Sequence, residues 1–195
     1  MRGRNKRTLL GLTAVAAFVA VALPGAAYAA DTDGTADITA GSLTIAAPTT
    51  VHFAATLNGL DQTVNATQAI DVLDNRGSGA GWNVTLSATT FTDDATPAHT
   101  LATDSISDGT AGVSGGPTSE CDSGVTCTTA SNTVEYPVAI TTAETDPTAV
   151  NILSADADTG LGGQTWTHTM HLKVPGNAVA GTYSSTWTYS VTTGP

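Results

Sequence analysis

Residues 166–174 read Trp-Thr-His-Thr-Met-His-Leu-Lys-Val, and this alternation of apolar and polar side chains predicts a β-strand. Trp166, His168 and Met170 share one face with a leucine and a valine, whereas threonines, a histidine and a lysine occupy the other. Antiparallel sheets with one wet face have this pattern. We therefore expect a half-buried antiparallel strand, in which His168 is a hydrogen-bonded residue of the core.

The same period of two recurs along the chain, and no stretch has the sustained spacing of an amphipathic helix. In residues 134–140 the alternation includes Pro137, which cannot donate to a ladder, so this segment is predicted to be an edge strand or a bulged one. Short strands between Gly, Asp, Asn and Ser clusters favour an all-β fold, an antiparallel β-sandwich of the Ig-like or Greek-key type. Further strands are predicted at residues 43–45, 51–55, 70–72, 82–91 and 182–191.

Residues 1–29 have the pattern of a secretory signal peptide. Four of the first seven residues are cationic, an apolar run follows, and an Ala-Tyr-Ala tripeptide ends at Ala29. Cleavage there leaves residues 30–195 as one domain, in which Arg76 and Lys173 are the basic residues against 17 acidic ones. Such a domain repels phosphate backbones, which argues against nucleic acid, and it retains no membrane span.

A long loop-rich insertion is predicted in the middle of the sandwich, over residues 92–132. The segment is rich in Asp, Thr, Gly and Ser, and either a projecting loop or partial disorder fits that composition. Cys121 and Cys127, the only cysteines of the chain, lie within it. Because export permits oxidation and the spacing is not the Cys-x-x-Cys of redox proteins, a loop disulfide is predicted.

No combination of residues predicts catalysis. Residues 112–117, Gly-Val-Ser-Gly-Gly-Pro, are similar to the nucleophile loop of trypsin-like proteases, but Val113 stands where that loop has an aspartate. No histidine segment of those enzymes accompanies it, and a serine nucleophile needs a base. The many carboxylates lie in turn-like sequences without an aromatic-rich cleft, so glycosidase chemistry is not predicted either. We expect a protein that is not an enzyme.

Asp156 and Asp158 form the one sequence that is similar to a metal site. Their alternation, followed by a glycine, is a fragment of a calcium loop, but the third ligand and the distal bidentate glutamate are missing. A solvated Asp-Gly turn and a calcium site both remain open. No histidine has a zinc-ligand spacing with the cysteines. The sequence therefore predicts no cofactor, with calcium as the one ion left open.

Two tryptophan segments resemble the W-x-L domain of Gram-positive surface proteins. The first pairs Trp82 with Val84 and follows an Asp-Asn-Arg-Gly turn at residues 74–77. The second pairs Trp187 with Tyr189 and follows Val-Pro and Gly-Thr-Tyr stretches. These segments and their flanks span nearly all of the chain after the leader. The resemblance implies a secreted protein that binds the cell wall, with peptidoglycan or another cell-wall polymer as its partner and other surface proteins as further partners.

The motif residues have two possible roles. Val84 and Tyr189 stand where the family has leucine, and the tyrosine changes both size and polarity. By strand parity Trp82 and Trp187 share a face with apolar residues, which favours the sandwich core, whereas the resemblance implies ligand contact. The function predicted is non-covalent association with peptidoglycan. The alternative is a protein-interaction or structural subunit of a surface complex without glycan affinity.

Overall fold

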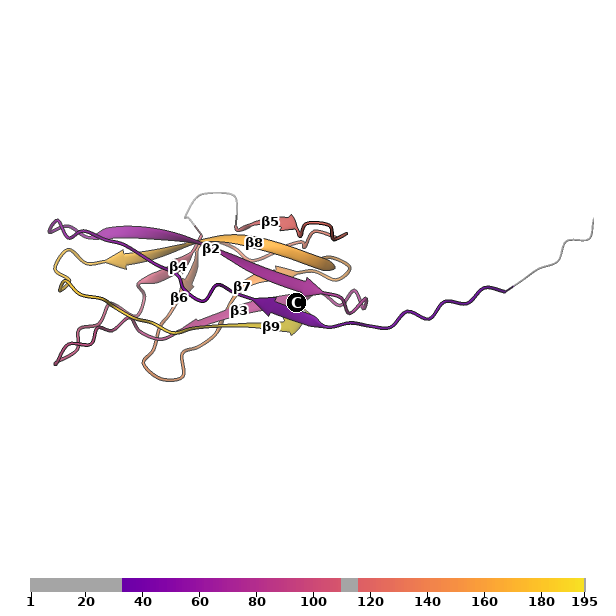
Figure 1. Ribbon diagram of the computed structural model, residues 1–195. Coiled ribbons are helices and arrows are strands. Elements are labelled where there is room, and N and C mark those ends of the chain that lie inside the picture. Colours follow the sequence, from indigo (N-terminus) through magenta and orange to yellow (C-terminus); the bar gives the residue numbers. More distant parts are fainter. Residues whose placement is uncertain (1–32, 110–115, 195) are drawn as a thin grey trace, which may run out of the picture. The chain divides into compact units, whose positions relative to one another are not determined.

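Two thirteen-residue strands form the centre of the fold. In the computed structural model, which describes residues 33–109 and 116–194, β2 (Gln62–Asp74) pairs with β8 (Gly162–Val174) along its full length (Figure 1). The pairing is antiparallel, with Gln62 opposite Val174 and Asp74 opposite Gly162. The antiparallel strand predicted within β8 is therefore confirmed.

The larger sheet has six strands in the order β1-β2-β8-β4-β6, and β5 also pairs with β8. Since β2 occupies one edge of β8 along its whole length, β4 and β5 share the other edge. All of these pairs are antiparallel. The shorter strands are β1 (Leu43–Ala46), β4 (Ile106–Asp108), β5 (Thr118–Cys121) and β6 (Val138–Ile140).

The smaller sheet has three antiparallel strands in the order β7-β3-β9. They are β7 (Val150–Ala155), β3 (Trp82–Ala88) and β9 (Trp187–Thr193). The register between β3 and β7 shifts between Val84 and Thr85, which is a β-bulge. β9 lies beside β1 of the other sheet, but within the described residues no ladder joins these two edges.

The core lies between the two sheets, where alternate residues of each strand meet. Trp82, Val84 and Leu86 of β3 are fully buried, and the residues between them are partly exposed. Trp166 and Met170 of β8 enter the same core. Each such side chain contributes roughly 1.5–3 kcal/mol when fully buried. The prediction of an all-β antiparallel sandwich is confirmed, while its Ig-like or Greek-key connection stays a prediction.

Four predicted strands differ from the structure, and the one predicted at 82–91 ends at Ala88. Residues 51–55 alternate in burial but pair with no strand, so the prediction there was wrong. The strand predicted at 134–140 begins only at Val138, and it is an edge strand, as predicted. The last strand begins at Trp187, because the preceding residues pair with 89–92 through an isolated bridge and single hydrogen bonds.

Two features of the fold were not predicted. β7 gives no alternating pattern, because Ile152 and Leu153 are both buried beside the bulge. The middle segment, 92–132, is loop-rich as predicted but supplies β4 and β5 to the larger sheet, and Ile106 of β4 is buried in the core.

The compact unit comprises Ile38–Pro195, and residues 33–37 of the amino-terminal unit are exposed. The predicted signal peptide and Val113 of the protease-like segment lie outside the described residues. Within the described part of the chain, no helix is long and apolar enough to cross a membrane.

Candidate functional site

A bidentate ion pair connects the regions around both tryptophan segments. Arg76 donates from Nε to Oδ1 of Asp74 (2.9 Å) and from Nη2 to Oδ2 (2.7 Å). The same guanidinium donates to the carbonyl of Gly81 (2.7 Å) and to Oγ1 of Thr193 (2.6 Å). The hydrogen bonds from Arg76 to Asp74 hold the pKa of this buried carboxyl below its ordinary value of 3.8. The Asp-x-Arg-Gly turn thus joins the end of β2 to the start of β3 and the end of β9.

Trp82 is a residue of the sandwich core. Its side chain is fully buried, its Nε1 donates to the carbonyl of Gly160 (2.9 Å), and its ring meets that of Trp166 edge-on at 6.5 Å. Val84 is also fully buried. The first motif therefore contributes both of its side chains, Trp82 and Val84, to the core.

The strands that carry the two motifs are direct neighbours although they are over a hundred residues apart in sequence. β3 and β9 pair with Trp82 opposite Thr193 and Ala88 opposite Trp187. The two tryptophans therefore lie at opposite ends of one ladder, and they do not form a common aromatic site.

Trp187 and Tyr189, in contrast, are half-buried at the edge of the smaller sheet. The Trp187 ring lies 6.2 Å from that of Phe53, and its Nε1 donates to Oγ of Ser185 (3.1 Å). The Tyr189 hydroxyl donates to Oε1 of Gln68 (2.8 Å), and burial raises the pKa of this hydroxyl above its ordinary value of 10. Both aromatic rings therefore present a neutral surface at physiological pH.

Trp187 and Tyr189 line a groove of about 730 Å³, which we call the hydroxyl groove. Residues 45–51 form one wall and residues 183–189 the other. No lining residue carries a charged side chain, and aromatic rings alternate with hydroxyls. The hydroxyl-bearing side chains are Thr49, Thr50, Ser184, Ser185, Thr186 and Thr188, together with the tyrosines.

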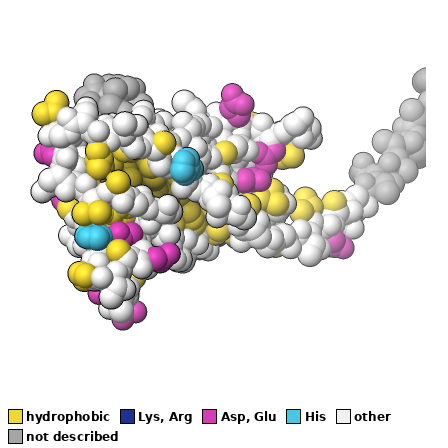
Figure 2. All heavy atoms as spheres, turned by 60° about the vertical axis from the view of Figure 1, so that its left-hand side comes forward, with side chains coloured by type: hydrophobic (Ala, Val, Ile, Leu, Met, Phe, Trp, Pro, Cys, Tyr) yellow, Lys and Arg dark blue, Asp and Glu magenta, His cyan; other side chains and the backbone are white. Residues whose placement is uncertain are grey.

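A second groove of about 440 Å³ adjoins the first and shares Val51, Phe91 and Tyr183 with it. We call it the apolar groove, because most of its lining side chains are Val, Ala, Leu and Phe. It opens at the end of the sandwich where β2 starts and β8 finishes. Hydrophobic side chains gather on this end of the molecule (Figure 2).

A family comparison assigns the two motifs to one domain. The sequence model described as WxL domain surface cell wall-binding matches residues 27–195. The chain belongs to the WxL family. Comparisons with curated proteins and with solved structures give no match. The family description makes association with the cell surface the function of this domain.

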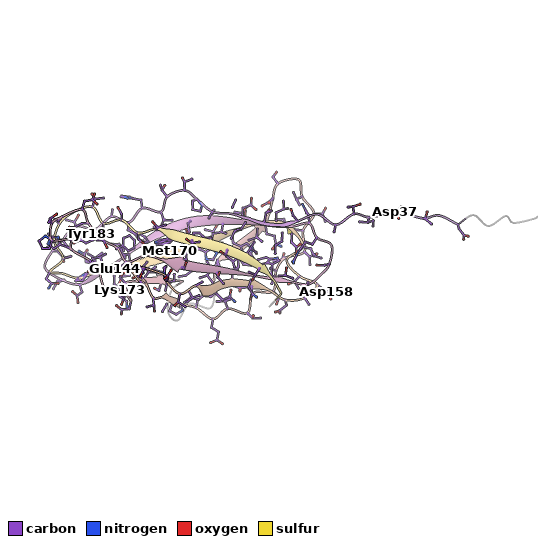
Figure 3. The ribbon with its side chains drawn as sticks, turned by 90° about the horizontal axis from the view of Figure 1, so that it is seen from below. Asp37, Glu144, Asp158, Met170, Lys173 and Tyr183 are labelled. Carbon is purple, nitrogen blue, oxygen red and sulfur yellow. A yellow bond between two sulfur atoms is a disulfide. The ribbon has the colours of Figure 1, made fainter. Side chains whose placement is uncertain are left out.

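The carboxylates suggested for calcium lie far from both grooves of the WxL domain. Figure 3 shows Asp158 at the opposite end of the sandwich from Tyr183. The carbonyl of Asp156 accepts hydrogen bonds from the backbone and hydroxyl of Thr159, and the backbone N–H of Asp158 donates to Gly79. Among the described residues, no group of three or more His, Cys, Asp and Glu side chains is placed to hold a metal ion.

The WxL domain also contains a buried His–Asp hydrogen bond and a disulfide. His168 Nδ1 lies 2.7 Å from Oδ2 of Asp108, and both side chains are fully buried, which confirms His168 as a hydrogen-bonded core residue. Cys121 and Cys127 are bonded to each other, as predicted, with their Cα atoms 5.7 Å apart. The adjoining Asp122 accepts from the Thr165 hydroxyl and so attaches this loop to β8.

The threonines and serines of the hydroxyl groove were not predicted from the sequence. They come from two segments that carry no motif of their own, residues 47–51 and 183–188, and these meet only when the two sheets pack. The single signal in the sequence was the density of Ser and Thr before Trp187.

Proposed function

We propose that this WxL domain is the wall-binding part of an exported surface protein, and that it holds a neutral glycan strand of peptidoglycan in the hydroxyl groove. The observation that supports this is the lining of the groove, where Trp187 and Tyr189 lie among hydroxyl side chains with no charge. A sugar presents apolar ring faces and many hydroxyls, so aromatic faces and hydroxyl partners are its chemical complement.

The charge of the chain favours this ligand over an anionic wall polymer. The part of the chain after the leader has Arg76 and Lys173 against 17 acidic residues, and both cations are already paired, with Asp74 and Asp104. The net charge of the domain therefore repels phosphate polymers. A neutral glycan avoids this repulsion, and its binding should depend little on salt. Calcium bridging through Asp156 and Asp158 is the alternative attachment.

Sedimentation with purified peptidoglycan tests the proposal. The protein should pellet equally in calcium, in chelator and in high salt, because neither cation bridging nor charge attraction holds it. Loss of binding in chelator would instead support calcium bridging. No sedimentation under any condition would refute glycan binding and favour the interaction-subunit function, for which the apolar groove is the supporting observation.

Matched valine substitutions test the groove itself. Thr50→Val and Thr188→Val remove hydroxyls of the lining without changing side-chain shape, and each should weaken binding by about 2- to 12-fold, which corresponds to roughly 0.5–1.5 kcal/mol per hydrogen bond. Thr118→Val is the control, since Thr118 is exposed on β5 and lines neither groove. Equal binding by all three variants would place the glycan elsewhere.

The proposed role includes no catalysis. Among the described residues, one His–Asp pair has both side chains fully buried, His168 with Asp108, and no substrate can approach it, which supports a binding role. Incubation of peptidoglycan with the protein should therefore release the same soluble fragments as incubation without it. The appearance of new soluble fragments would contradict this.

A further inference from the structure

The exposed large hydrophobic side chains of the described residues are unevenly distributed. Leu57 (38% exposed) and Val179 (47%) line the apolar groove. Leu60 (69%) lies at the same end, because its backbone directly contacts the turn at Gly176. The most exposed of all is Ile38 (95%), which precedes the first strand. The chain therefore carries both an apolar groove in contact with water and an apolar side chain without a place in the core.

One wall of the apolar groove includes a segment, residues 51–57, whose backbone pairs with no strand. Residues 51–57 alternate in side-chain burial at their start, as a strand does, but they belong to no ladder. Within the described residues, their backbone takes part in one hydrogen bond, which the Gln62 side chain donates to the carbonyl of Thr56 (2.8 Å). Unpaired backbone groups beside an apolar groove are the arrangement to which an extended segment can add as a strand.

The amino-terminal residues 33–40 have the properties of such a segment. All are exposed and none belongs to a ladder. Ala36, Ile38 and Ala40 are every second residue, so an extended conformation places three apolar side chains on one face. The segment carries two carboxylates, Asp33 and Asp37, both before Ile38, and the groove lining contains no Asp, Glu, Lys or Arg.

We propose that residues 33–40 of one copy add as a β-strand to residues 51–57 of a second copy, with Ile38 seated in the apolar groove. Backbone hydrogen bonds supply the pairing, and burial of Ile38 among Leu57 and Val179 supplies the apolar contact. Because the segment and the groove are different surfaces, the contact is head-to-tail, and repetition gives a ring or an open filament.

The acidic surface predicts how this assembly responds to salt. Each copy is strongly acidic after the leader, so two copies repel each other at low ionic strength. Asp33 and Asp37 of the added segment meet no Lys or Arg in the groove lining, so salt removes the repulsion without breaking an ion pair. Assembly should therefore increase with salt, which is the opposite of a contact made by ion pairs.

Analytical ultracentrifugation of the protein from residue 30 onward, over a range of concentrations in high salt, tests the proposal. The average mass should rise with concentration for the unmodified protein and for Val125→Asp, which alters an exposed hydrophobic residue outside the groove. Ile38→Asp should remain monomeric at every concentration. A monomeric unmodified protein, or an Ile38→Asp variant that assembles equally, would overturn the proposal.

A cysteine trap tests the geometry independently of affinity. No described cysteine is free, so each of the variants Ile38→Cys and Ala55→Cys has a single free thiol. Ala55 lies in the wall of the groove, and the two variants are mixed under mild oxidation. Cross-strand neighbours reach disulfide distance, so a mixed dimer should form. Ile38→Cys mixed with Ala157→Cys, on the distant Asp-rich turn, is the control. Equal yields from the two mixtures would overturn the proposal.

The assembly and the glycan proposal can fail separately. Both experiments above contain no peptidoglycan, and the hydroxyl-groove variants Thr50→Val and Thr188→Val should assemble as the unmodified protein does. Loss of assembly in these two variants would contradict the placement of the strand in the apolar groove.

Discussion

The two motif tryptophans should differ in their contribution to stability, because their burial differs. Trp82→Ala empties a fully enclosed site, removes the edge contact with Trp166 and leaves the Gly160 carbonyl without its donor. Truncation of a buried tryptophan costs about 3–5 kcal/mol. Trp187 is half-buried and faces a groove, so Trp187→Ala should cost about half as much.

Urea unfolding followed by circular dichroism measures the difference. With an m-value of roughly 2 kcal/mol per molar urea, Trp82→Ala should lower the midpoint by about 2 M and Trp187→Ala by about 1 M. Trp82→Phe, which keeps a ring but loses the indole N–H, should lie between Trp82→Ala and the unmodified protein. Equal shifts for the two alanine variants, or a larger shift for Trp187→Ala, would refute the assignment of Trp82 to the core and Trp187 to the groove.

Three further outcomes are expected. Since Arg76 lowers the pKa of Asp74, the stability from this pair is present above pH 3.8 and is lost as the pH falls through the folded-state pKa. The urea midpoint of Asp74→Asn should therefore change less between pH 7 and pH 3 than that of the unmodified protein. Equal changes in the two proteins would contradict this. Replacing Cys121 and Cys127 together by serine should lower the free energy of unfolding, measured in urea, by roughly 2 kcal/mol at most, because the closed loop is short. A larger loss would mean that the disulfide supports more than this loop. Sequencing of the exported protein should begin at Ala30, whereas an intact leader in a membrane fraction would contradict cleavage.

Local patterns in the sequence predicted the strands that have one buried and one wet face. β3 and the second half of β8 alternate because their odd and even residues meet different environments. The pattern failed at β7, where a bulge beside Val84 buries both Ile152 and Leu153. It also failed at residues 51–55, where the alternation exists but no partner strand does.

The sequence by itself determined the all-β class, the disulfide and the family, since each depends on residue types at short spacing. Only the tertiary structure decided what the motif residues do. The pairing of β3 with β9 separates Trp82 from Trp187, and the packing of residues 45–57 against 178–189 creates both grooves. These contacts join segments far apart in the chain, and long-range strand pairing leaves no mark in the local periodicity of either partner.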